Sequence, residues 1–238
     1  PFVRQAAARF IADMDRDDIV LDEDGERWCR FLEKLPHVKG RWASKSEKLK
    51  LSDWQIFCVV NLYGWKNAAG LRRFREAYIE VPRKNGKSFL VAGLGVAHLC
   101  IDNEHGAEIY CGATSEKQAW EVFRPAKTIC ERNPALLKAF GDEPNAKAIT
   151  RADVGSRFEP VIGKPGDGSS PSCAIADEFH EHSDADQVDT FTTGMGSREQ
   201  PMMIYITTAG VDMGGPCFAK RADVADILKG TIEDDRVF

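Results

Sequence analysis

The residues with the most direct chemistry are those from 81 to 88, which read VPRKNGKS. Their ending, Gly86-Lys87-Ser88, is that of a phosphate-binding loop, in which the glycine allows a tight turn and the lysine reaches the β and γ phosphates. The serine hydroxyl would hold Mg²⁺. Val81, however, stands where the usual pattern G-x-x-x-x-G-K-S/T has its first glycine. The segment therefore predicts either a modified nucleotide site or a chance turn at the start of a helix.

An acidic pair, Asp177-Glu178, closes the apolar run CAIADE far downstream of this loop. In ATPases with a phosphate-binding loop, the first carboxylate of such a pair binds the magnesium shell, and the second orients or deprotonates the attacking water. Two carboxylates at the carboxyl end of a buried strand are unfavourable without a cation to hold. The pair and the loop together predict a site for ATP and Mg²⁺, with Asp177 beside Ser88 on the metal and Glu178 as the catalytic carboxylate.

Two histidines, His180 and His182, follow the acidic pair in DEFHEH. Together with Cys173 they make a zinc site conceivable, but their spacing matches no strong zinc pattern. We therefore expect histidines that lie beside the nucleotide rather than a zinc centre.

Two cations, Arg83 and Lys84, lie in the first half of the 81–88 segment. An arginine inside a phosphate-binding loop can approach the γ-phosphate and stabilise its charge as that group leaves. The alternative is that Arg83 points to solvent. The chemistry of the residues alone leaves both interpretations open.

The elements that must position these residues are recognisable from their hydrophobic patterns. The segment 77–82, AYIEVP, is a short β-rich run, and a helix-length apolar run from 88 to 101 follows the loop. Further strands are predicted at 107–113, 158–163, 172–178 and 202–210, and an amphipathic helix at 115–133, with Ser115 as its N-cap and Gln118 at capping-box spacing. Strands that alternate with helices predict an α/β fold, with a mainly parallel central sheet and helices on both faces.

The N-terminal part of the chain has a different pattern. Residues 1–25 are acidic and suit a helix followed by a loose connection, and apolar residues recur at helical spacing from 28 to 66. We therefore expect a small N-terminal helical subdomain over 1–70 that forms a lid over the nucleotide, an α/β core over 71–230 and an acidic tail over 231–238.

Composition limits the classes of protein that fit the sequence. A chain of 238 residues that is 43% hydrophobic and 29% charged is typical of a soluble globular protein with a real core. The net charge of −5 argues against a surface that coats nucleic acid everywhere, but basic clusters at 39–50 and 72–76 allow either a local contact with DNA or solvated faces. Seven cysteines without a C-x-x-C pair favour a reducing cytoplasm, and the longest apolar run, 89–101, is too short to span a membrane.

In these motifs the sequence resembles the large terminase subunit of tailed double-stranded DNA bacteriophages, the ATP-driven motor that packages viral DNA into the procapsid. VPRKNGKS resembles the family's deviant phosphate loop with an early arginine, and CAIADEFHEH its strand that ends in an acidic pair. ITTAG (206–210) resembles the coupling motif, LSDWQIF (51–57) the adenine-contacting segment, and YCGATSEKQAWEVF (110–123) the second strand and its helix. The resemblance runs from about residue 30 to the end of the chain and implies a P-loop NTPase of the RecA-like, ASCE type.

The resemblance implies a role for each matching residue. Nucleotide contacts would come from the adenine-reading Gln55 and from the loop residues Arg83, Lys84, Asn85, Gly86, Lys87 and Ser88. Catalysis would use Glu178, Lys87 and, as sensor of the γ-phosphate, Arg83, while Ser88 and Asp177 would hold Mg²⁺. Thr207 and Thr208 would sense hydrolysis and transmit it.

Some members of the family offer an arginine to the ATP of the neighbouring subunit, from a position just before the acidic strand. This chain has KPGDGSSPS there, with Asp167 at about that position. Arg124, Lys164 and Arg198 are the alternatives, and the sequence does not choose among them.

The resemblance also implies partners and a setting. We expect double-stranded DNA, the small terminase subunit, the portal protein and a ring of further copies of the chain, in the host cytoplasm and without a membrane. The nuclease domain of the family has no room after ITTAG, and 231–238 would begin the linker to it. The chain, which begins at Pro1, is therefore expected to be a fragment that hydrolyses ATP and does not cut DNA.

Two other functions remain open. DEFH also fits the D-E-x-H box of two-domain helicases, but their second RecA-like domain needs more residues than follow ITTAG. The other is a nucleotide-binding module that orders an oligomer without significant turnover. Glu178 argues against it, because a module that only binds has no use for a water-activating carboxylate.

Overall fold

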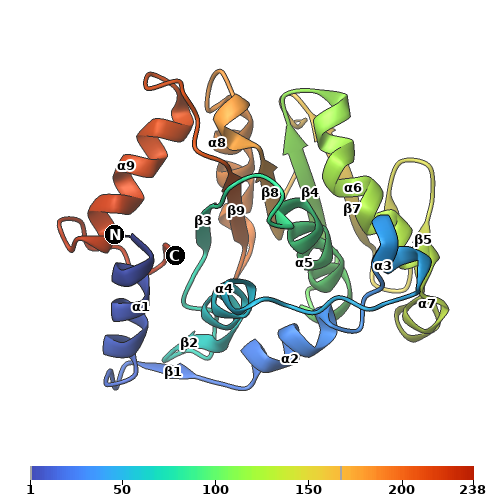
Figure 1. Ribbon diagram of the computed structural model, residues 1–238, viewed down its shortest axis with the longest axis horizontal. Coiled ribbons are helices and arrows are strands. Elements are labelled where there is room, and N and C mark those ends of the chain that lie inside the picture. The colour runs from blue at the N-terminus through green and yellow to red at the C-terminus, as the bar shows by residue number, and fades with distance from the viewer. Residues whose placement is uncertain (1, 167) are drawn as a thin grey trace.

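A central β-sheet organises the protein. The computed structural model describes residues 2–166 and 168–238, and its main sheet has seven strands in the order β3-β9-β8-β4-β7-β6-β5 (Figure 1). The strands β3, β9, β8, β4 and β7 are parallel, and β6 and β5 are antiparallel additions at one edge. The prediction of an α/β fold with a mainly parallel sheet is confirmed.

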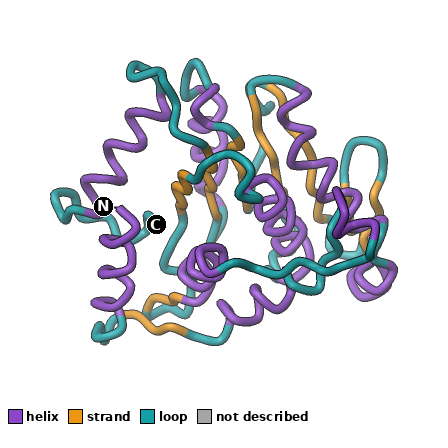
Figure 2. The backbone as a smooth tube through the Cα atoms, in the orientation of Figure 1, coloured by secondary structure: helices purple, strands orange, loops and turns teal. Residues whose placement is uncertain are grey.

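Helices predominate before β3, and after it a helix separates most of the successive parallel strands (Figure 2). The strands are β1 Ile19–Leu21, β2 Trp65–Asn67, β3 Glu76–Glu80, β4 Glu108–Ala113, β5 Asp142–Pro144, β6 Ile149–Arg151, β7 Ser156–Ile162, β8 Cys173–Asp177 and β9 Met202–Thr207. The helices are α1 Phe2–Asp13, α2 Asp24–Leu32, α3 Gly40–Ser44, α4 Asp53–Gly64, α5 Lys87–Ile101, α6 Glu116–Glu131, α7 Pro134–Phe140, α8 Asp186–Gly194 and α9 Pro216–Leu228, with 3-10 turns at Phe179–Glu181 and Met195–Ser197. β1 and β2 form a separate antiparallel pair. The main-sheet strands and the two helices that the sequence predicts are present, with ends within three residues of those expected.

Helices cover both faces of the sheet (Figure 1). Along β8, Cys173 and Ile175 belong to the hydrophobic cluster that contains α5 and α6, whereas Ala174 and Ala176 belong to the cluster that contains residues of α8 and α9. Successive residues of a strand point to opposite faces. Both faces of β8 are therefore buried, which explains why the strand is one continuous apolar run.

The helix that follows the 81–88 loop crosses the core. α5 is apolar on every side, as expected of a helix without a solvent face. Gly95 allows its close approach to β7, because a Cβ at this position would lie 2.5 Å from Cε1 of Phe158. Among residues 2–166 and 168–238, no helix is long and apolar enough to cross a membrane.

The N-terminal helices share the main hydrophobic core. Trp28 of α2 stacks on Tyr63 of α4, with 3.6 Å between the ring centroids. The hydroxyl of Tyr63 lies 3.0 Å from Nε2 of His98 in α5. The predicted N-terminal helical region is therefore packed directly on the helix that follows the loop, and its role as a lid over the nucleotide stays a prediction.

The last residues of the chain lie along the edge of β3. Phe238 donates its N–H to Glu76 O (2.9 Å), and its carbonyl accepts from the N–H of Tyr78 (2.9 Å). Val237 pairs with Glu76 in the parallel sense. That 231–238 lead into a further domain stays a prediction, but the final residues are themselves part of this fold.

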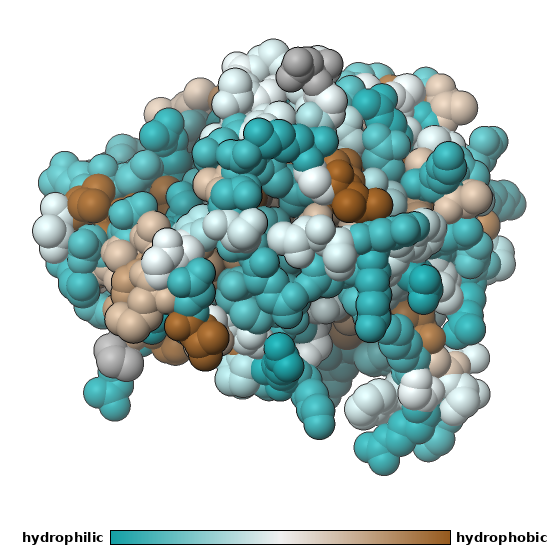
Figure 3. All heavy atoms as spheres, turned by 90° about the horizontal axis from the view of Figure 1, so that it is seen from above, coloured by the Kyte–Doolittle hydropathy of each residue, from teal (hydrophilic) through white to brown (hydrophobic). Residues whose placement is uncertain are grey.

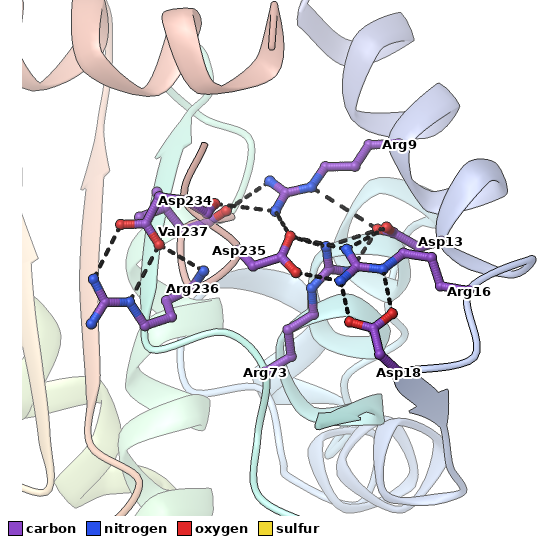
Figure 4. Close-up of polar contacts among 9 residues, drawn as sticks. All are labelled: Arg9, Asp13, Arg16, Asp18, Arg73, Asp234, Asp235, Arg236 and Val237. Carbon is purple, nitrogen blue, oxygen red and sulfur yellow. Dashed lines mark hydrogen bonds and ion pairs between the residues drawn. The ribbon is translucent and has the colours of Figure 1, made fainter. Parts of the chain in front are cut away.

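The arginines that begin the basic cluster 72–76 are not on a charged surface. Arg72 and Arg73 are 2% and 4% exposed. Arg72 pairs with Asp102, and Arg73 donates to Asp13 (2.6 Å) within a cluster of charges that ties α1 to the C-terminal residues (Figure 4). Both expectations for these two arginines, a contact with DNA or a solvated face, are wrong, because carboxylates from distant parts of the chain neutralise them.

Candidate nucleotide-binding site

The 81–88 loop joins the carboxyl end of β3 to the first turn of α5. Lys84 and Gly86 have positive φ, 68° and 80°, so the chain turns sharply before the helix. The side-chain amide of Asn85 donates back to the carbonyl oxygens of Pro82 (3.1 Å) and Arg83 (3.3 Å). The first N–H groups of α5 have no acceptor within the helix, so this turn presents them to an anion.

Two residues of the loop meet the acidic pair at the end of β8. Nζ of Lys87 donates to Oε1 of Glu178 (3.2 Å), and Oγ of Ser88 donates to Oδ2 of Asp177 (3.5 Å). They meet because β3 and β8 flank β9, and the three parallel strands end at the same edge of the sheet. The structure thus brings the two motifs together as the sequence predicts.

The carboxyl group of Asp177 is buried, with 3% of the residue exposed. Burial, and to a smaller extent the nearby carboxylate of Glu178, raise the pKa of Asp177 from 3.8 to about 6. A buried carboxyl of this kind gains from a cation, and the hydroxyl of Ser88 beside it is a second oxygen ligand of the type that Mg²⁺ accepts. The residues at this position therefore fit a magnesium ion.

The two histidines after the acidic pair have different surroundings. The ring of His182 packs against Phe179, with centroids 5.2 Å apart, and burial lowers the pKa of His182. Nδ1 of His180 lies 3.3 Å from Oε2 of Glu178 and 2.9 Å from Oγ1 of Thr207. In the part of the chain that the structure describes, no three His, Cys, Asp or Glu side chains are grouped so that they could hold a metal ion. His180 thus contacts the acidic pair, whereas His182 belongs to the packing behind it.

The threonines at the end of β9 lie at the same edge of the sheet. Thr207 and Thr208 are 0% and 7% exposed. Oγ1 of Thr207 donates to the carbonyl of Thr208 (2.9 Å) and accepts from the backbone N–H of His180 (3.1 Å). Of the two predicted coupling residues, Thr207 is therefore the one that is hydrogen-bonded to the segment after the acidic pair.

Gln55, in the first turn of α4, lies beside the loop. A Cβ on Gly86 would be 3.5 Å from Nε2 of Gln55. Oε1 of Gln55 accepts from the N–H (2.9 Å) and the hydroxyl (3.1 Å) of Ser52, which completes a capping box at the start of α4. One end of the amide is therefore fixed, and Nε2 is left as a donor next to the loop.

Arg83 and Lys84 lie on the exposed part of the loop. Within residues 2–166 and 168–238, neither side chain has an ion-pair partner. The face at the carboxyl ends of the strands is mostly hydrophilic when seen from above (Figure 3). Both cations are therefore accessible to an anion at the loop, and the contact of Arg83 with a γ-phosphate stays a prediction.

Arg198, one of the three candidates for a cation offered to a neighbouring subunit, is committed within the chain. It donates to Glu104 (2.9 Å), to the carbonyl of Ser170 (2.9 Å) and to the carbonyl of Gly106 (2.8 Å). These partners precede β4 and β8, at the edge of the sheet opposite the acidic pair. The position and the three hydrogen bonds indicate a structural role for Arg198.

The other two candidates lie on the surface. Lys164 pairs with Asp186 (2.6 Å), and the exposed Arg124 lies over the ring of Trp120, 5.7 Å from its centroid. Asp167 lies outside the described residues. Arg124 and Lys164 therefore stay candidates.

The sequence analysis names His180 as a neighbour of the nucleotide but not its contact with Thr207, and it does not name Ser52. Ser52 had a signal, because it precedes Gln55 at capping-box spacing in LSDWQIF.

The chain is similar to known proteins. Residues 53–225 match the protein family described as the terminase large subunit, ATPase domain. The chain is 30% identical to the terminase large subunit of Enterobacteria phage HK97 over 216 residues, which are 88% of this chain and 39% of that protein. It is 44% identical to protein YmfN of Escherichia coli (strain K12) over 91 residues, which are 38% of this chain and 20% of YmfN.

A solved structure is also similar to this chain. The crystal structure of the HK97 bacteriophage large terminase matches with a TM-score of 0.73 and 28% identity, over 90% of this chain and 42% of that one. The chain thus spans less than half the length of these relatives. The matched family region contains the 81–88 loop, the acidic pair and the end of β9. The chain belongs to the terminase large subunits and corresponds to their ATPase domain.

Proposed function

We propose that the chain binds Mg²⁺ and ATP at the 81–88 loop and hydrolyses the ATP. The observation that carries this proposal is the contact of Lys87 with Glu178 and of Ser88 with Asp177 at one edge of the sheet. The four residues supply a cation for the phosphates, two oxygen ligands for the metal and one further carboxylate for water. A module that only binds nucleotide does not require that last carboxylate, so Glu178 favours turnover.

Each side chain has a role in this proposal. Lys87 exchanges Glu178 for the β and γ phosphates, which frees Oε1 of Glu178 for the attacking water. Ser88 and Asp177 would hold Mg²⁺, which would supply positive charge against the phosphates. Arg83 extends from the loop toward the γ-phosphate, and Nε2 of Gln55 donates to the adenine.

In the longer terminase, we propose that hydrolysis drives translocation of double-stranded DNA into the procapsid. Family membership supports a motor that works in the host cytoplasm as a ring of copies, with the small terminase subunit and the portal protein as partners. Thr207 and Thr208, at the strand end beside Glu178, would transmit hydrolysis, and Arg124 or Lys164 would act on the ATP of a neighbouring copy.

Segment 39–50 is the proposed contact with DNA. Four of its cations, Arg41, Lys45, Lys48 and Lys50, are exposed and have no ion-pair partner among the described residues, whereas Lys39 lies 3.6 Å from Glu121. Cations without carboxylate partners are available to phosphates of a nucleic-acid backbone. Segment 39–50 is favoured over the basic cluster 72–76 because its cations are exposed, whereas Arg72 and Arg73 are buried.

The ATPase proposal is tested with Lys87→Ala and Glu178→Gln. Lys87→Ala is expected to lose both ATP binding and phosphate release. Glu178→Gln is expected to bind ATP while kcat falls by on the order of 100-fold or more. Lys147→Ala, at an exposed position in the β5–β6 turn, is the control and should change neither quantity. Hydrolysis by either site variant at the parental rate would refute the assignment.

The DNA proposal is tested by charge reversal. Lys45→Glu combined with Lys48→Glu should weaken binding to double-stranded DNA and reduce the slope of log K against log[salt] by about 2. Lys147→Glu combined with Lys229→Glu changes net charge equally on other exposed surfaces and is the matched control. Equal effects of the two pairs would show that segment 39–50 is a solvated face.

A further inference from the structure

One imidazole proton lies between the acidic pair and the end of β9. Nδ1 of His180 is 2.9 Å from Oγ1 of Thr207 and 3.3 Å from Oε2 of Glu178. The single hydroxyl proton of Thr207 is directed at the carbonyl of Thr208 (2.9 Å). Oγ1 of Thr207 is then an acceptor toward His180, and a carboxylate is always an acceptor. Counting donors therefore assigns the proton to Nδ1 of His180.

This proton has two acceptors, and a full hydrogen bond to one weakens the bond to the other. Oε2 of Glu178 is buried and lacks a hydrogen-bond partner within residues 2–166 and 168–238, while Oε1 is held by Lys87 (3.2 Å). When Lys87 turns to the phosphates, the carboxylate loses its cation and becomes a stronger competitor for Nδ1–H. Thr207 then loses that donor.

We propose that His180 is a positioning residue that passes the state of the Glu178 carboxylate to Thr207 at the end of β9. This inference rests on the proposed function, because it takes Glu178 as the carboxylate that acts on water. In the nucleotide-free protein Nδ1–H is bonded to Thr207. With ATP bound, it is bonded to Glu178 and orients that carboxylate.

The surroundings hold the ring in one orientation. The side chain of His180 is 12% exposed, and its backbone N–H is bonded to Thr207 Oγ1 (3.1 Å). Gly210 leaves space for it, since a Cβ there would lie 2.8 Å from Cβ of His180. Nε2 faces Oε1 of Glu181 at 3.7 Å, so a proton on this second nitrogen is accommodated and Nδ1–H stays in place.

Substitutions at His180 test whether the position of the N–H donor matters or only the size of the side chain. Asn places an amide nitrogen near the position of Nδ1, Gln places it near that of Nε2, and Ala removes the donor. We expect kcat to fall on the order of 10- to 100-fold in His180→Ala and His180→Gln with little change in KM, and His180→Asn to stay within about threefold of the parent. His105→Ala, at an exposed position before β4, is the control. An Asn variant as slow as the Ala variant, or an Ala variant as fast as the parent, would overturn the inference.

A double-mutant cycle tests the connection to β9. Thr207→Val removes the hydroxyl and keeps the shape of the side chain. If His180 acts through Thr207, the fold-loss in kcat caused by His180→Ala is smaller in the Thr207→Val background. An equal fold-loss in kcat in both backgrounds would show that His180 does not act through Thr207.

The tautomer is measurable without turnover. In ¹⁵N-labelled nucleotide-free protein at alkaline pH, the imidazole of His180 should show a protonated Nδ1 and an unprotonated Nε2, and the Nδ1 resonance should shift on addition of Mg²⁺ and a non-hydrolysable ATP analogue. The opposite tautomer would overturn the inference. A parent protein that releases no phosphate would refute the proposed function. The NMR measurement would still show whether Nδ1 of His180 carries the proton and responds to the nucleotide.

Discussion

The buried carboxyl group of Asp177 should make the ligand-free protein less stable as pH rises. Its pKa is raised from 3.8 to about 6, first by burial and then by the charge of Glu178. A carboxyl whose pKa is raised on folding is harder to ionise in the folded state. The unfavourable term is absent below the unfolded-state pKa of 3.8, grows between the two pKa values, and is complete above about 6.

The size of this effect follows from the pKa shift. About two pKa units correspond to about 3 kcal/mol of differential stability. Asp177→Asn removes the charge and keeps the shape, including an oxygen that can accept from the N–H of Glu178, as Oδ1 does at 3.0 Å in the parent. The variant should therefore be more stable than the parent by about 1–2 kcal/mol at pH 5 and by about 3 kcal/mol at pH 8. The larger value corresponds to a rise in Tm of roughly 6–12 °C for a chain of this size.

The assay is urea and thermal unfolding between pH 5 and pH 8 in a chelating buffer without nucleotide. Asp17→Asn, at an exposed position, is the matched control and should show no gain that grows with pH. Addition of Mg²⁺ and ADP should reverse the order, because ligand binding stabilises the parent and the variant lacks the carboxylate that holds the metal. An Asp177→Asn protein no more stable than the parent at pH 8, or a difference that does not shrink toward pH 5, would refute the reasoning.

Three further substitutions test the fold and the base contact. Arg72→Met removes the cation that pairs with the buried Asp102 and leaves this carboxylate beside the imidazole of His98 (2.9 Å). The free energy of unfolding measured in urea should therefore fall by about 3–5 kcal/mol, and a loss below about 1 kcal/mol would contradict the buried pair. Gly95→Ala brings a Cβ to 2.5 Å from the ring of Phe158, so Tm should fall by an amount equivalent to about 1–3 kcal/mol despite the better helix propensity of alanine; a rise in Tm would contradict this. Ser52→Ala removes one donor to Oε1 of Gln55, so the free energy of unfolding should fall by about 1 kcal/mol. The preference for ATP over GTP in a competition binding assay should also weaken. An unchanged preference would show that Gln55 does not recognise the base.

The sequence predicts the centre of the parallel core well because β4, β8 and β9 are buried on both faces. A continuous apolar run such as CAIAD or MMIYIT has no other stable place in a folded chain. The sequence does not predict β5, because its three residues are Asp142-Glu143-Pro144 and only pairing with β6 defines them as a strand. The same holds for Val237 and Phe238, which are placed by their pairing with the edge of β3.

The candidate site also has features that the sequence predicts and features that it does not. The meeting of the loop with Asp177 and Glu178 is predictable, because parallel strands end at one edge and the order of the strands is limited. The burial of Arg72 and Arg73 is not, since their carboxylate partners lie 30 and 60 residues away and a sequence shows the charge of an arginine without its partner. Hydrogen bonds of His180 and Thr207 depend on side-chain geometry at two strand ends, which no residue pattern specifies.

The absent first glycine of the loop has a structural explanation. The N–H of Val81 donates to the carbonyl of Thr207 (3.1 Å), so Val81 continues the parallel pairing of β3 with β9 and has no need of the backbone freedom of glycine. The sharp turn comes later, at Lys84 and Gly86, the two residues of the loop with positive φ. A β-branched residue is therefore favourable at position 81. Because the partner of its N–H is Thr207, the start of the 81–88 loop is bonded directly to the strand end that His180 contacts. If the loop binds phosphates as proposed, a change there would have two short paths to the end of β9, one through the backbone of Val81 and one through Glu178 and His180, and both would end at Thr207.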